Sequence, residues 1–156
     1  MGYFVETAEI DFAIPAENLD AAYEAMCKLN ERDDLKRGGV WGGKDEDYAK
    51  PAGSTSLASS ARKNFSWMDW NYDETCTTAQ EIFEQLGFDT DVDEEGNLRV
   101  LFYDNKTGQE ELFLEACAPY VDQGSYIIWH GEDNAMWQNE FDGETMNTKH
   151  AKIVWE

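Results

Sequence analysis

Apolar and polar residues alternate near the start of the chain and predict a β-strand over residues 3–14. Side chains at every second position of a strand share one face, and this spacing is shown by Ala8, Ile10, Phe12 and Ile14. Pro15 ends the strand, because proline suits the first turn of a helix. The spacing changes to three and four over residues 16–32, which predicts a helix with one buried stripe. That stripe consists of Leu19, Ala22, Tyr23, Met26 and Leu29.

Two further helices are predicted from their first residues. Thr78 and Glu81 have the spacing of a capping box, and so do Thr107 and Glu110. Apolar residues three or four positions apart follow each pair. Gly87 then supplies the left-handed residue that commonly ends a helix.

The clearest predicted hairpin covers residues 88–104, FDTDVDEEGNLRVLFYD. Asp89, Asp91 and Asp93 alternate with less charged residues, so a regular strand would place all three carboxylates on one face. Glu94, Glu95, Gly96 and Asn97 form the predicted turn. The three aspartates are therefore expected to lie in a row.

A second hairpin is predicted from strands at residues 125–130 and 135–141, and a last strand from residues 150–155. The short aromatic stretch at residues 65–72 is also expected to be a strand. Together these elements predict a single α+β domain over residues 1–156, with two or three helices on one face of an antiparallel sheet. This two-layer sandwich is expected to be ferredoxin-like in part.

Residues 38–63 are rich in glycine and serine and show little periodicity. Such a long connection is unusual inside a compact domain, which indicates a mobile loop or a binding element. Trp41 stands in this loop away from the other tryptophans. An exposed tryptophan on a loop is a plausible anchor for a small molecule or a peptide.

The charge of the chain says more about its possible partners than any motif does. The chain has 33 acidic and 12 basic residues, a formal net charge of -21. Residues 64–148 carry 20 acidic residues but only Arg99 and Lys106 as basic ones. Phosphates repel such a surface, so direct binding to nucleic acid or to an anionic membrane is disfavoured. The charge favours a basic partner protein, or else it serves only solubility or adaptation to salt.

The start of the chain has no signal-peptide pattern, and no apolar run is long enough for a transmembrane helix. The three cysteines, Cys27, Cys76 and Cys117, are widely spaced and form no CxxC motif. Reduced thiols in the cytoplasm are the expectation.

Motifs for catalysis and cofactor binding fail on inspection. Gly38, Gly43 and Lys44 match part of a phosphate-binding loop, but Asp45 replaces the required serine or threonine. The three alternating aspartates lack the glycine and glutamate of a calcium loop. No ligand spacing joins His130 and His150, the only two histidines, to nearby carboxylates. We therefore expect no catalytic residue, no metal and no cofactor. A carboxylate or metal enzyme is the weakest alternative.

In kind, the sequence resembles the small acidic proteins that phages make to block host defence, including anti-CRISPR and anti-restriction DNA mimics. The segments YFVETAEIDF and FDTDVDEEGNLRVLFYD carry this resemblance, together with chain length and acidity. It implies an inhibitor in the host cytoplasm that occupies the basic, nucleic-acid-binding surface of a partner. Carboxylates on a rigid scaffold can fill a groove that neutralises phosphates. The residues expected to bind the partner are Asp89, Asp91, Asp93, Glu94, Glu95, Glu132, Asp133, Glu140, Asp142, Glu144 and Trp41. A binding module for a small molecule or peptide, built on residues 38–63 and Trp41, is the alternative.

Overall fold

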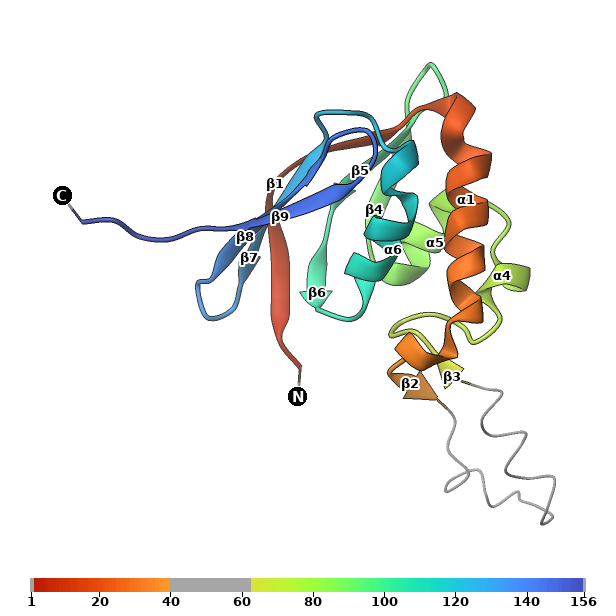
Figure 1. Cartoon of the computed structure of the whole chain (residues 1–156), viewed down its shortest axis with the longest axis horizontal. Coiled ribbons are helices and arrows are strands. Elements are labelled where there is room, and N and C mark those ends of the chain that lie inside the picture. The colour runs from red at the N-terminus through yellow and green to blue at the C-terminus, as the bar shows by residue number, and fades with distance from the viewer. Residues whose placement is uncertain (1, 40–62, 156) are drawn as a thin grey trace, which may run out of the picture.

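Helices and an antiparallel sheet form two layers in the computed structural model, which describes residues 2–39 and 63–155 (Figure 1). The main helices are α1 (Leu19–Lys28), α5 (Ala79–Leu86) and α6 (Glu110–Cys117), with a short α4 (Tyr72–Thr75). The strands of the large sheet are β1 (Phe4–Ile14), β4 (Asp89–Val92), β5 (Leu98–Phe102), β6 (Asp104–Lys106), β7 (Tyr126–Gly131), β8 (Met136–Phe141) and β9 (Met146–His150). The predicted α+β class is therefore confirmed.

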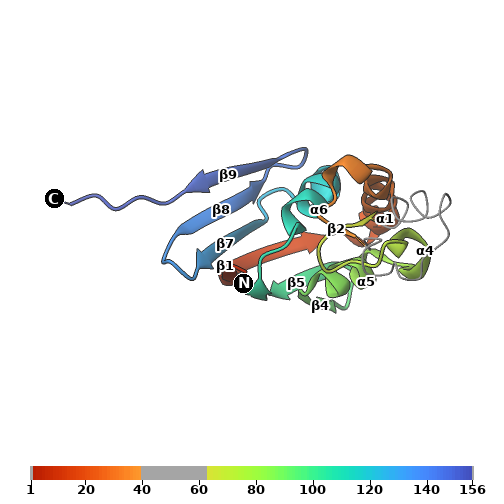
Figure 2. The same cartoon turned by 90° about the horizontal axis from the view of Figure 1, so that it is seen from below.

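The strand order is β4-β5-β1-β7-β8-β9, and β6 pairs with the first residues of β1. Every neighbouring pair is antiparallel. Part of this sheet and its helices has the connectivity and strand order of a ferredoxin-like unit. This part consists of β1, α1, β4, β5, α6 and β7. Strands β8 and β9 extend the sheet beyond the helices (Figure 2).

Strand β1 changes its buried face in the middle. Val5 and Thr7 are buried in its first half, whereas Phe12 and Ile14 are buried in its second half. The register with β7 shifts between Thr7 and Glu9, which is a β-bulge. Because a bulge inserts one extra residue, it moves the inward side chains from odd to even positions. Ala8 lies at the bulge and is exposed, although the regular alternation predicts it inside.

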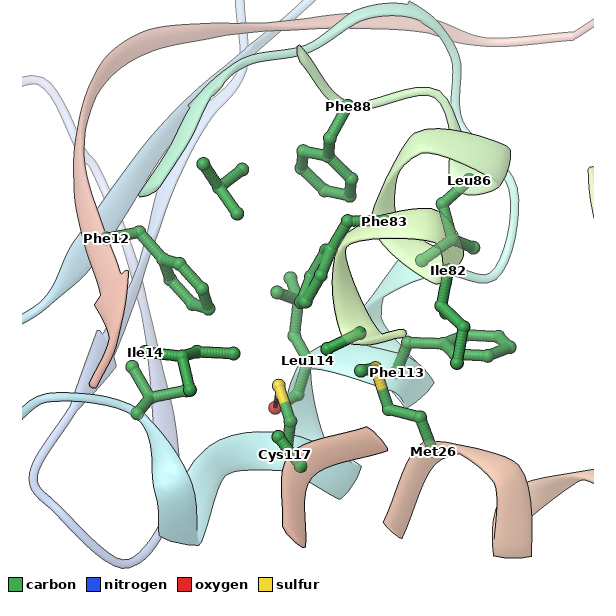
Figure 3. Close-up of a cluster of buried hydrophobic side chains, with 14 of the residues drawn as sticks. Phe12, Ile14, Met26, Ile82, Phe83, Leu86, Phe88, Phe113, Leu114 and Cys117 are labelled. Carbon is green, nitrogen blue, oxygen red and sulfur yellow. Dashed lines mark hydrogen bonds between the residues drawn. The ribbon is translucent and has the colours of Figure 1, made fainter. Parts of the chain in front are cut away.

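The core lies between the helices and one face of the sheet (Figure 3). Phe83 of α5 makes edge-to-face contacts with Phe12 of β1 and with Phe88, at centroid distances of 5.8 and 5.7 Å. Met26 of α1 and Phe113 of α6 are also fully buried. The predicted apolar helix faces therefore meet in one core.

Helix ends follow local hydrogen bonding. The Thr78 hydroxyl accepts the Glu81 backbone N–H at 3.1 Å, so the predicted cap of α5 is confirmed. Gly87 ends this helix with a φ of 114°. The second predicted capping box is wrong, because α6 starts one residue after Gln109. Thr107 donates its hydroxyl to the Glu110 carboxylate instead, at 2.6 Å.

The aromatic stretch 65–72 is not a strand, contrary to the prediction. Phe65, Met68 and Tyr72 are buried three and four positions apart, as in a turn of helix rather than a strand. Between them, Trp67 has a φ of 75° and is 42% exposed. The left-handed conformation breaks the extended backbone that a strand needs.

The last predicted strand is displaced along the chain. Strand β9 ends at His150, and Ala151–Trp155 follow it without regular secondary structure. The short strand β6 was not expected at all. At the glycine-rich segment, β2 (Gly38–Gly39) pairs with β3 (Lys63–Asn64), while residues 40–62 and the predictions on them lie outside the described residues. Among the described helices, none is long and apolar enough to cross a membrane.

Candidate binding surface

The sheet has one face against the helices and one face toward solvent. Alternation along the strands assigns the side chains: Ile127 and Trp129 of β7 are buried, whereas Tyr126, Ile128 and His130 between them are not. Residues paired across antiparallel strands share a face. We call the solvent side the open face. The pairings, together with alternation along each strand, place on it Phe4, Glu6, Glu9, Asp11, Asp89, Asp91, Arg99, Leu101, Asp104, Lys106, Tyr126, Ile128, His130, Met136, Gln138, Glu140, Asn147 and Lys149.

Carboxylates outnumber cations on the open face. Its seven acidic residues are Glu6, Glu9, Asp11, Asp89, Asp91, Asp104 and Glu140, and its lysines and arginine are Arg99, Lys106 and Lys149. Two of these cations are already paired: Arg99 with Asp11 at 3.3 Å, and Lys149 with Glu140 at 3.2 Å. Glu9 accepts a hydrogen bond from the Tyr126 hydroxyl. The open face therefore keeps an excess of negative charge.

Apolar side chains lie among these carboxylates. Phe4 is 48% exposed, Leu101 46% and Met136 38%, and Ile128 is half-buried at the centre of the face. Lys106 places its ammonium group 5.8 Å from the centroid of the Phe4 ring. Protein interfaces combine apolar contact with charged groups in this way. Such a surface offers a partner apolar contacts and ionic contacts together.

A shallow cleft of about 220 Å³ opens at one end of this face. Its lining includes Glu6, Asp104 and Glu132 with His130. Glu6 stands directly opposite Asp104 on β6 and opposite His130 on β7. The His130 Nδ1 atom is 3.5 Å from a Glu6 oxygen. Opposed carboxylates on neighbouring strands repel, so a cationic group of a partner placed here is stabilised.

The aspartates of two turns are occupied by the turns themselves. In the β4–β5 turn, Asp93 accepts the backbone N–H groups of Glu95 and Asn97 at 2.9 and 3.0 Å. In the β8–β9 turn, Asp142 accepts those of Glu144 and Thr145 at 2.9 and 2.8 Å. Backbone donors favour the charged form, so these hydrogen bonds lower the pKa of both carboxyl groups. Both aspartates hold their turns and are poor candidates for binding a partner.

This role predicts a pH-dependent effect of Asp142→Asn. The pKa of Asp142 is lower in the folded chain than in the unfolded chain, so its stabilisation is present above about pH 4 and is lost as the pH falls through the folded pKa. At pH 7 the variant is therefore expected to unfold at lower urea concentration than the wild type, and this difference should shrink in strong acid. Asp89→Asn removes the same charge from an exposed position and serves as the control. Equal effects of both substitutions at both pH values would assign the result to net charge.

The acidic residues of the β7–β8 turn also bond within the fold. Glu132 accepts the Phe4 backbone N–H at 2.6 Å, and Asp133 accepts the Tyr3 hydroxyl and the Ala135 N–H. These bonds fasten the start of the chain to the turn. The pKa of Asp133 is lowered, first by the Tyr3 hydroxyl.

The predicted partner-binding residues do not form one array. They lie on β4 (Asp89, Asp91), in the β4–β5 turn (Asp93, Glu94, Glu95), in the β7–β8 turn (Glu132, Asp133), on β8 (Glu140) and in the β8–β9 turn (Asp142, Glu144). The β7–β8 turn bonds to Phe4 at the first residue of β1, whereas Asn97 of the β4–β5 turn bonds to Ala16 beyond its last residue. An 11-residue strand separates these turns by roughly 30 Å. The β7–β8 turn lies at one end of the sheet, and the β4–β5 and β8–β9 turns lie at the other end but at opposite edges, which is why the residues are dispersed.

The predicted row of three aspartates fails at its third member. Asp93 lies beyond the strand in the turn, whereas Asp89 and Asp91 stand two positions apart on β4 and are both exposed. The register shift between Asp89 and Thr90 puts the extra residue in β5, and Asp91 pairs opposite Arg99. Trp41 lies outside the described residues.

The residues that the sequence prediction missed are Glu6, Glu9, Asp11 and Asp104. The alternation in YFVETAEIDF contained this signal, because acidic residues occupy many of the positions between its apolar residues. Alternation alone does not reveal which residues share the face, because the position of β1 in the centre of the sheet depends on long-range pairing.

The cysteines and the metal-ligating residue types give no second site. Cys117 is fully buried, and burial raises the pKa of its thiol to about 12. Within residues 2–39 and 63–155, no group of three His, Cys, Asp or Glu side chains is arranged to hold a metal ion.

Comparisons of this chain with protein-family models, with curated proteins and with solved structures find no match.

Proposed function

We propose that this protein binds a basic surface of a partner protein through its open face, and that it inhibits the partner by occupying a surface that otherwise binds nucleic acid. The observation that carries the proposal is the excess of carboxylates, with exposed apolar residues among them, on a rigid sheet face that no described helix covers. Carboxylates in fixed positions lose little conformational freedom on binding, so they can compete with phosphates for lysine and arginine.

The apolar residues separate this proposal from a role in solubility alone. Exposed carboxylates improve solubility wherever they lie, and α1 and its flanks also carry several. Exposed apolar side chains do not improve solubility, yet Leu101, Met136 and Ile128 lie on the same face as the carboxylates. A protein partner can bury these side chains while its cations meet Glu6, Glu9 and Asp104.

The resemblance to acidic phage inhibitors supports a more specific form of the proposal. In that form the partner is a nucleic-acid-binding protein of host defence, and the inhibitor acts in the host cytoplasm.

A charge-matched pair of variants tests the open face. The first carries Glu6→Gln, Glu9→Gln, Asp104→Asn and Glu140→Gln, and the second carries Glu17→Gln, Asp20→Asn, Glu24→Gln and Glu31→Gln on and beside α1. The readout is displacement of a labelled DNA duplex from a decaarginine peptide, measured by fluorescence anisotropy over a salt series. Each exposed pair contributes about 0.2–1 kcal/mol, so the first variant is expected to displace the duplex about tenfold less well than the wild type. The second is expected to stay close to the wild type.

Two results would contradict the proposal. If both variants weaken equally, affinity follows net charge and the open face has no special role. If the wild type binds labelled decaarginine directly with the same affinity at low and high salt, the interaction is not electrostatic. Circular dichroism of both variants checks that neither has lost its fold.

A further inference from the structure

The segment Ala151–Trp155 leaves the sheet after β9 and extends away from it (Figure 1). Ile153 is 79% exposed, Val154 67% and Trp155 89%. Its last bond to the sheet is from the Ala151 N–H to the Met136 carbonyl, at 3.0 Å. From Lys149 to Trp155 the chain has no acidic residue. A basic and apolar segment therefore projects from an acidic domain.

The segment is not shaped to fold back onto its own open face. A reversal after His150 needs turn residues such as glycine, proline, asparagine or aspartate, and the sequence AKIVW contains none. Ile153, Val154 and Trp155 favour an extended backbone instead. Five extended residues reach about 17 Å. An extended segment with unpaired backbone groups is suited to strand addition at the edge of another sheet.

Strand β4 is an edge of that kind. Its partner in the described sheet is β5, and its other side is open. The Asp93 N–H bonds toward β5, to the Asn97 carbonyl. Because N–H directions alternate along a strand, those of Thr90 and Val92 point to the open side. The Val92 N–H is held there by the neighbouring Asp91 carboxylate at 2.9 Å.

Charge and side-chain alternation match between the two segments. On β4, Asp91 lies on the open face, while Thr90 and the 44% exposed Val92 lie on the other face. In the segment, Lys152 alternates with Ile153 and Trp155 in the same way. A pairing that places Lys152 beside Asp91 therefore places Ile153 beside the Thr90 and Val92 side. It also draws the Asp91 carboxylate toward an ammonium group and frees the Val92 N–H for the added strand.

We propose that residues 151–155 of one copy add as a strand to the β4 edge of a second copy. Pairing of two β9 edges is the obvious alternative, but it brings Lys149 and Lys152 of both copies together, and like charges repel. The donor segment follows β9 and the acceptor is β4, at opposite edges of the sheet (Figure 2). The contact is heterologous, so copies associate head to tail.

Sedimentation velocity of the full chain over a wide concentration range tests this association. The wild type is expected to grow in mass with concentration. Lys152→Glu and Asp91→Lys are each expected to weaken association by about tenfold or more, because each puts like charges together. The two substitutions in one chain restore opposite charges and should restore association. Lys28→Glu, which changes the net charge as Lys152→Glu does, should have little effect.

A monomeric wild type at every concentration would overturn the proposal. So would association that Lys152→Glu weakens but Asp91→Lys leaves intact, since the segment then docks elsewhere. Ile153→Ser with Trp155→Ser adds an independent arm: if the chain still associates normally, the segment is not the donor. None of these substitutions touches Glu6, Glu9, Asp104 or Glu140, so failure here leaves the displacement test of the open face unaffected.

Discussion

Phe83→Ala is expected to lower the free energy of unfolding by about 3–5 kcal/mol, the range found when a buried phenylalanine is truncated. Phe83 is fully buried between α5 and the sheet, where its ring contacts Phe12 and Phe88. Both neighbours belong to packed elements, β1 and the start of the β4 hairpin, so they cannot move far enough to fill the cavity. The loss therefore includes a cavity cost as well as the transfer of the ring to water.

Urea denaturation followed by circular dichroism measures this loss. Phe102→Ala is the matched control, because Phe102 is 41% exposed at the end of β5. Its truncation is expected to cost about 1 kcal/mol or less. Similar losses for both variants would mean that Phe83 is not a centre of the core.

Asn139→Ala is expected to cost about 1–3 kcal/mol, because it leaves a buried donor without an acceptor. Asn139 is fully buried on β8, and its Oδ1 atom accepts the indole N–H of Trp129 at 2.7 Å. Its Nδ2 group donates to the Thr148 hydroxyl of β9 at 3.0 Å. One amide thus joins β7, β8 and β9 beneath the open face.

Asn147→Ala is the control for this prediction. Asn147 is exposed on β9, and its amide makes only a 3.4 Å contact with Asp142. Unfolding in urea compares the two variants. A second variant, Asn139→Ala with Trp129→Phe, removes the indole N–H as well. If burial of the unpaired donor causes the loss, the effect of Asn139→Ala should be smaller in the Trp129→Phe background than in the wild type.

The buried amide has a consequence for the open face. Strands β8 and β9 extend beyond the helices, so they depend on side-chain contacts to stay aligned with β7. Trp137 stacks on Trp129 at 6.4 Å, and the amide of Asn139 adds a polar link below them. Glu140 and Lys149 therefore keep fixed positions at the far side of the open face.

The sequence alone predicted those helices and hairpins whose caps, turns and apolar spacing involve residues close together in the chain. Thr78 and Gly87 mark the ends of α5 because caps involve backbone groups only three to five residues away. The two hairpins were predicted because turn residues and alternation lie next to each other. The fold class followed from the order of these elements, and the strand order agrees with it.

Long-range contacts decided which residues make up the candidate surface and where the local predictions failed. The bulge at Ala8 depends on pairing with β7, more than 110 residues later in the chain. Val5 and Thr7 are therefore buried at positions that regular alternation assigns to solvent. The stretch 65–72 is aromatic like a strand, but burial of Phe65, Met68 and Tyr72 against other elements bends it. Local propensity cannot anticipate either result.

For the acidic surface too, the sequence determined one part and the tertiary structure the other. Composition was sufficient to show an acidic protein, because net charge does not depend on how the chain folds, and a basic partner stays a prediction. Which carboxylates share a face depends on strand order and register. These bring Glu6, Glu9 and Asp11 of β1 together with Asp104 and Glu140, whereas Asp93 and Asp142 bond to their own turns. Sequence alternation places a side chain above or below its strand, and only the neighbouring strands determine what lies beside it.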